Sequence, residues 1–145
     1  MNKRMAVIVT SCDSYSDIWD PFFKLMDIYW KDVPYPVFLN TETIDYNKAY
    51  NHFMVKSINL SAGRDLKKTT WSRRMLDVLE RIEEEYVFIL IEDFFLRERV
   101  QTELLEQILN QMDENPLMSQ VQLFGTRTNC DKGITNELTF DMEMR

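Results

Sequence analysis

The chain has 145 residues, 45% of them hydrophobic, with only three glycines and four prolines, which is globular composition and excludes a disordered or fibrous protein. Its formal net charge of −7 excludes a general electrostatic attraction to nucleic acid or to an anionic membrane. Neither a secretory signal nor an apolar stretch of transmembrane length is visible, and two cysteines are too few for a disulfide framework. We therefore expect a cytoplasmic protein.

The first half of the chain predicts alternating strands and helices. Three strands are expected, at residues 5–10, 37–39 and 53–60. Asp20 and Pro21 have the pattern of a helix cap followed by a proline at the first helical position, and apolar side chains then recur at helical spacing. The stretch between residues 40 and 50 is polar and is expected to form a loop.

The second half continues the alternation. Thr70 is expected to cap a helix with one apolar face, formed by Trp71, Met75, Val78, Leu79 and Ile82. Another helix is expected from Thr102 to about Asp113, ended by Asn115 and Pro116. Alternating patterns predict two further strands, at residues 120–124 and, more weakly, at 134–140.

The most informative stretch is residues 86–91, an uninterrupted apolar run that ends in Glu92 and Asp93. Such a run predicts a central strand buried on both faces of a helix-covered parallel sheet. The two carboxylates would then lie at the edge where ligands bind in open α/β sheets. Because burying two acids costs free energy, we expect a cation beside them, either a divalent metal or an arginine.

The element order predicts a single α/β domain over residues 1–145, in which helices sandwich a mostly parallel sheet. With these elements in place, the chain resembles the nucleotide-sugar-binding half of GT-A-type (Rossmann-like) glycosyltransferases, particularly those of bacterial polysaccharide or lipopolysaccharide biosynthesis. The resemblance lies in three stretches, Ala6 to Tyr15 (AVIVTSCDSY), Trp71 to Leu76 (WSRRML) and Tyr86 to Leu96 (YVFILIEDFFL). About fifty residues follow Asp93, so the acceptor-binding half would be short or missing.

The resemblance implies a divalent metal, Mn²⁺ or Mg²⁺, bound at Glu92 and Asp93 and holding the diphosphate of a nucleotide-sugar donor. Asp93 is expected to be the main ligand, while Glu92 points to the opposite face of the strand. A hard cation would neutralise the charge that develops on the diphosphate during glycosyl transfer to a saccharide or lipid-linked acceptor. The family's DXD motif has a second Asp that Glu92-Asp93-Phe94 lacks, which leaves open whether the chain is an active enzyme.

The resemblance also assigns donor-binding residues. Thr10, Ser11 and Asp13 would contact the base or ribose, and Tyr15 would stack on it. Trp71 and Arg74 lie where the family's donor-binding helix begins, and a helix N-terminus with basic residues suits a phosphate.

Each assignment has a structural alternative. Asp13 would cap a turn, Trp71 would lie in the core on the apolar face of its helix, and the basic residues between Arg64 and Arg74 would form a solvated surface. His52 is the single histidine and is interpreted as structural.

Two further functions stay open. One is a non-catalytic nucleotide-sugar or protein-interaction module of the same fold. The other, more distant, is a receiver-like phosphorylation domain with acids at the strand ends. A homodimer would be one way to cover a strand edge left unpaired.

Overall fold

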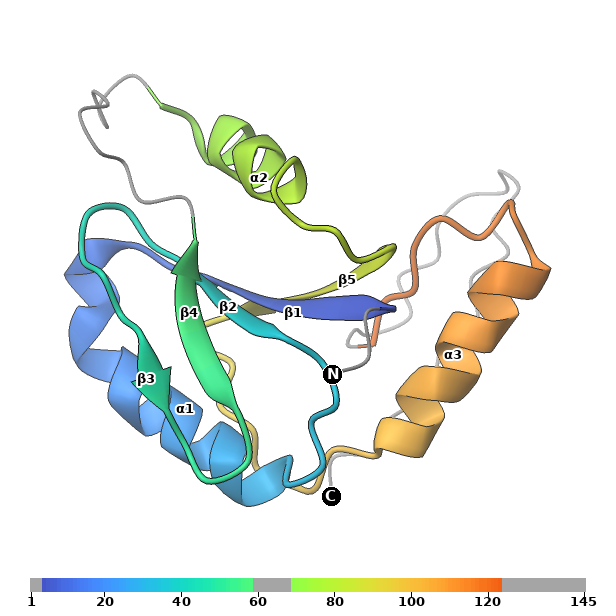
Figure 1. Ribbon diagram of the computed structural model, residues 1–145, viewed down its shortest axis with the longest axis horizontal. Helices are drawn as coiled ribbons and strands as arrows, with labels where there is room; N and C mark the ends of the chain where they lie inside the picture. The colour runs from blue at the N-terminus through green and yellow to red at the C-terminus, as the bar shows by residue number, and fades with distance from the viewer. Residues whose placement is uncertain (1–3, 59–68, 124–145) are drawn as a thin grey trace, which may run out of the picture. The chain divides into compact units, whose positions relative to one another are not determined.

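A computed structural model describes residues 4–58 and 69–123, and the chain separates into two compact units, residues 1–100 and 101–145. The first unit contains five strands among its described residues, and they form one sheet (Figure 1). Their bounds are β1 Met5–Thr10, β2 Val37–Asn40, β3 Lys48–Ala49, β4 Met54–Ile58 and β5 Tyr86–Ile91. The helices in the described part of this unit are the short 3-10 helix η1 Asp13–Tyr15, α1 Ser16–Tyr29 and α2 Trp71–Leu79.

The sheet has the strand order β3-β4-β2-β1-β5. Strands β1, β2, β4 and β5 are parallel, and the two-residue β3 pairs antiparallel with β4. The predicted α/β class is therefore confirmed, with a mixed sheet that is parallel apart from one short strand. The strands expected near residues 5–10, 37–39 and 53–60 are all present, whereas β3 falls in the stretch that was expected to be a loop.

The core of this unit surrounds β1, in which Val7, Ile8 and Val9 are fully buried. Helix α1 covers one face of the sheet and α2 the other (Figure 1). The contact face of α1 is apolar and largely aromatic because bulky residues recur every three to four positions. Its buried apolar side chains, Trp19, Phe22, Phe23 and Met26, are each at most 1% exposed.

The expectation that the strand at residues 86–91 is buried on both faces is wrong. Within the described chain, β5 lies at the end of the strand order and pairs only with β1. Its residues Ile89 and Ile91 are each 43% exposed, whereas all six residues of β1 are buried. A continuous apolar run shows that a strand suits an apolar environment, but the strand order decides how many neighbours it has.

The predicted start of α1 is also wrong. The helix begins at Ser16, directly after the 3-10 turn, so Pro21 lies inside it. Asp20 does not cap the helix. Its carboxylate instead accepts hydrogen bonds from Tyr46, Tyr50 and Lys48 and pairs with Lys24. A proline suits the first helical turn, but it is not confined to that position.

Helix α2 begins as predicted, because the Thr70 hydroxyl accepts a hydrogen bond from the Arg73 backbone N–H at 3.2 Å. In the second unit, α3 spans Thr102–Glu114 and ends before Asn115 and Pro116, as expected. Its buried residues are Thr102, Leu105, Ile108 and Leu109. Residues 120–123 form no strand, and the strand expected at 134–140 lies outside the described residues.

Candidate functional site

The carboxyl edge of the sheet contains a topological switch point between β1 and β5. The chain runs from β1 to β2 and β4 on one side and then returns to the other side of β1 as β5. Thr10 and Ile91 are paired in register, so Ser11 and Glu92 follow these two strands at the same level. Ligands of open α/β sheets bind in the crevice at such a point. The structure therefore brings the two predicted groups, residues 10–15 and residues 92–93, to one edge.

The hydroxyl groups at the end of β1 contact other parts of the protein. Ser11 is 8% exposed, and its Oγ accepts a hydrogen bond from the Trp19 indole N–H at 2.7 Å. Thr10 is 6% exposed, and its Oγ1 lies 3.5 Å from the Asn40 side-chain nitrogen. These bonds fix the end of β1 against α1 and β2. Tyr15, in contrast, is 53% exposed.

Asp13 joins the loop after β1 to the loop after β2. Its carboxylate accepts hydrogen bonds from the backbone N–H groups of Glu42, Thr43 and Ile44 and from the Thr43 hydroxyl, while its own N–H donates to Glu42. Burial by itself raises the pKa of Asp13, but the bonds from Thr43, Ile44 and Glu42 outweigh it and hold the pKa below the usual 3.8. The geometry supports the turn-capping alternative for this residue.

Arg74 extends from α2 into the same pair of loops. It is 8% exposed, and its guanidinium donates to the Thr41 carbonyl at 2.6 Å, the Ser11 carbonyl at 3.4 Å and the Glu42 carboxylate at 3.2 Å. A planar guanidinium is suited to several fixed acceptors at once. These contacts make Arg74 a clamp between α2 and the loops after β1 and β2.

The two acids after β5 differ in their environment. Glu92 is 7% exposed, whereas Asp93 is exposed. Within residues 4–58 and 69–123, the Glu92 carboxylate forms no hydrogen bond or ion pair. Neither carboxylate oxygen of Glu92 is among the fully buried polar atoms that lack a partner. No group of three or more His, Cys, Asp or Glu side chains that could hold a metal exists in the described part of the chain.

Sequence reasoning missed three residues of this site, Asn40, Thr41 and Glu42. Asn40 and Thr41 are 1% and 0% exposed, and within the described chain Asn40 Oδ1 and Thr41 Oγ1 have no hydrogen-bond partner. Leaving such an atom unsatisfied costs about 1–3 kcal/mol, so a water molecule or a ligand group is needed here. The available signal was a polar Asn-Thr-Glu run directly after the strand at 37–39.

Trp71 is not a core residue, as its position on an apolar helix face had suggested. It is 60% exposed, while Met75 and Val78 of the same face are buried. Trp71 is the first residue of α2, one turn before the buried part of the helix. Of the basic residues from Arg64 to Arg74, the first three lie outside the described residues, and Arg73 pairs with Asp77 at 3.1 Å.

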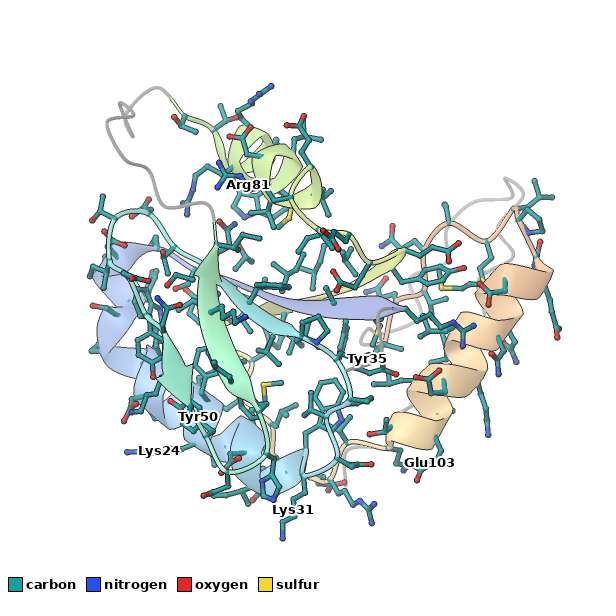
Figure 2. All side chains as sticks on the ribbon, in the orientation of Figure 1. Lys24, Lys31, Tyr35, Tyr50, Arg81 and Glu103 are labelled. Carbon is teal, nitrogen blue, oxygen red and sulfur yellow. The ribbon has the colours of Figure 1, made fainter. Side chains whose placement is uncertain are left out.

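A second polar network joins α1 to the β3–β4 hairpin. The hydroxyl groups of Tyr46 and Tyr50 lie 2.9 and 3.2 Å from Asp20 Oδ1, and Figure 2 shows Tyr50 over α1. Burial and the neighbouring Asp20 carboxylate raise the pKa of Tyr46 to about 12. Both tyrosines therefore stay protonated at neutral pH and act as donors that hold the hairpin.

His52 likewise has a structural partner. Its Nδ1 and its backbone N–H both lie 2.9 Å from Asp27 Oδ1, and Asp27 is 7% exposed. At the C-terminal end of α1, a surface cavity of about 400 Å³ is lined by Ile28, Tyr29, Lys31, Asp32 and Arg99. None of the residues predicted to bind a ligand lines this cavity.

Comparison of the chain with protein-family models, with curated proteins and with solved structures found no match. Among the described residues, no helix has the length and apolar character needed to cross a membrane. The fold and the geometry of the carboxyl edge are therefore the basis for any functional assignment.

Proposed function

We propose that the carboxyl edge of the sheet binds a nucleoside diphosphate sugar, and that the chain is a glycosyltransferase-like protein that transfers the sugar to an acceptor hydroxyl. The observation that carries this proposal is the position of Glu92 and Asp93 beside the end of β1, at the topological switch point. The resemblance of the β1, α2 and β5 segments to nucleotide-sugar-binding proteins supports the same assignment.

Two adjacent acids at the switch point favour a cation in the complete site. Removing an unpaired carboxylate from water costs several kcal/mol, unless the group is protonated or a cation joins it. Arg74, the buried arginine at this edge, directs its guanidinium at two backbone carbonyls and Glu42. We infer that the cation of Glu92 is bound together with the ligand.

The residues fit a cation shared with a phosphate group, and they do not fit a metal held by protein side chains alone. The described chain offers Glu92 and its neighbour Asp93, but no group of three potential ligands. Mg²⁺ commonly binds one or two carboxylates together with substrate phosphates and water. Glu92, with Asp93 next to it, would hold such an ion. Bound there, the ion would neutralise the negative charge of the leaving diphosphate.

Asp13 and Arg74 serve this site as positioning residues. Asp13 bonds the loop after β1 to the backbone of the loop after β2, and Arg74 bonds α2 to both loops. Together they set the spacing of the loops beside the switch point. A preorganised site binds its ligand without having to order these loops on binding. The contacts of Arg74 thus support loop positioning more strongly than direct phosphate contact.

The test is calorimetric titration with UDP, GDP, ADP, CDP and dTDP, with and without Mn²⁺ or Mg²⁺. We expect metal-dependent binding of at least one nucleotide by the wild type. Glu92→Gln should abolish the metal dependence, and Asp93→Asn should weaken binding less, because Asp93 is exposed. Glu85→Gln is the matched control, since it removes an exposed carboxylate just before the opposite end of β5.

Turnover with the corresponding nucleotide sugar then separates the two functions that share this site. Release of the nucleoside diphosphate in the presence of an acceptor supports a transferase, whereas metal-dependent binding without turnover supports a non-catalytic module. If no nucleotide binds under any metal condition, the proposal is wrong.

A further inference from the structure

Trp71 differs from the other two tryptophans of the chain in its environment. Trp19 and Trp30 are 1% and 0% exposed, and both have ring contacts, with Tyr46 and with Tyr35 respectively. Trp71 is 60% exposed, and within the described residues it has no ring contact or side-chain hydrogen bond. A large aromatic surface is thus left open to solvent at the start of α2.

The contacts of the site already described place the start of α2, which carries this ring. Thr70 caps α2, and its carbonyl accepts the Arg74 backbone N–H at 3.1 Å. Trp71 and Arg74 are three residues apart and therefore neighbours on the helix surface. The Arg74 guanidinium reaches the Ser11 and Thr41 carbonyls, so the first turn of α2, with Trp71, lies at the carboxyl edge of β1 and β2.

A second observation at this edge also points to a ligand. The unsatisfied atoms Asn40 Oδ1 and Thr41 Oγ1 belong to the end of β2 that Arg74 contacts. Polar atoms that need a partner and an exposed aromatic ring thus occur in one small region. A planar heterocycle would stack through its face, and because Asn40 Oδ1 and Thr41 Oγ1 are buried, its edges and ribose would reach them through water.

We infer that Trp71 is the stacking platform for the base of the nucleoside diphosphate. This inference rests on the proposed function and adds a specific contact to it, one made by the base and not by the phosphates. Every base has a π-face, so stacking on Trp71 contributes affinity without by itself selecting one nucleotide. Selection among bases then falls to the polar groups at the ends of β1 and β2.

Tryptophan fluorescence tests the inference directly, because the other two indoles are buried. Iodide should quench Trp71 in the free protein, and a bound nucleoside diphosphate should both quench its emission and protect it from iodide. The probes are the same five nucleoside diphosphates, with inorganic pyrophosphate as a ligand that carries the phosphates but cannot stack. Pyrophosphate should bind in calorimetry without changing the fluorescence.

Variants of α2 give an independent measure. Trp71→Ala should weaken nucleotide binding by roughly five-fold to a hundred-fold and leave pyrophosphate binding unchanged, and Trp71→Phe should recover part of the loss. Leu76→Ala is the matched control, because Leu76 is a 53% exposed apolar residue on the same helix. Both side chains are exposed, so the variants are expected to fold.

The outcomes separate this inference from the proposed function. Nucleotide binding that neither quenches Trp71 nor depends on it overturns the stacking role and leaves the donor site intact. Quenching by an oligosaccharide such as maltoheptaose, without quenching by any nucleotide, also overturns it and assigns Trp71 to a saccharide. Absence of nucleotide binding by the wild type overturns both.

Discussion

Strands β1 and β5 have similar apolar sequences, MAVIVT and YVFILI, but they lie in different environments. They are paired along their whole length, with Ile8 opposite Ile89. Ile8 is fully buried, while Ile89 is 43% exposed. Apolar composition therefore indicates which segments form the sheet, and the strand order determines how much burial each strand contributes to stability.

The loops that follow β1 and β5 also differ, in how firmly the rest of the protein holds them. The loop after β1 is bonded to the loop after β2 through Asp13 and to α2 through Arg74. The acids after β5 have no comparable bonds within the described chain, and one of them, Glu92, is buried. One loop is thus preorganised by bonds within the protein, whereas we propose that the other binds a cation together with the ligand.

The largest effect is expected from a matched pair of substitutions across β1 and β5. Ile8→Ala should lower the free energy of unfolding by about 3–5 kcal/mol, because it leaves a cavity in a closely packed core. Ile89→Ala should lower it by only about 1 kcal/mol, because this side chain is already partly solvated. Urea denaturation followed by circular dichroism measures both. Equal losses would mean that β5 is as important to the core as β1.

A smaller loss of stability is expected when the Arg74 clamp is removed. Arg74→Met removes the hydrogen bonds to Ser11, Thr41 and Glu42 and should cost about 2–3 kcal/mol in urea denaturation. Arg81→Met is the control, since Arg81 is exposed and lies just beyond α2 (Figure 2). It should change stability by less than about 0.5 kcal/mol. If the two variants are equally stable, the clamp contributes nothing.

The smallest loss of stability is expected from Asp13→Asn, and it should depend on pH. Because the pKa of folded Asp13 is below 3.8, its contribution to stability is complete above that pH and is lost as the pH falls through the folded-state pKa. Asp13→Asn should therefore cost about 1 kcal/mol at pH 7, and the difference from wild type should shrink below about pH 4. Urea midpoints at pH 7, 4 and 3 measure this. A constant difference would show that the carboxylate charge has no role.

Local patterns in the sequence determined the elements of the fold. The apolar β-branched run at residues 5–10 gives β1, and Thr70 gives the start of α2, because strand formation and helix capping depend on neighbouring residues. The same patterns placed Thr10, Ser11, Glu92 and Asp93 at strand ends, and parallel pairing brings such ends to one edge.

Only the tertiary structure decided what each of these residues contacts. The strand order put β5 at the end of the described sheet. Trp71, at the start of α2, lies in solvent, and the Arg74 guanidinium donates to carbonyl groups of two loops that are far away in the chain. Burial likewise singled out Glu92, where the sequence had favoured Asp93. These outcomes depend on contacts between residues far apart in the chain, and local propensity contains no information about such contacts.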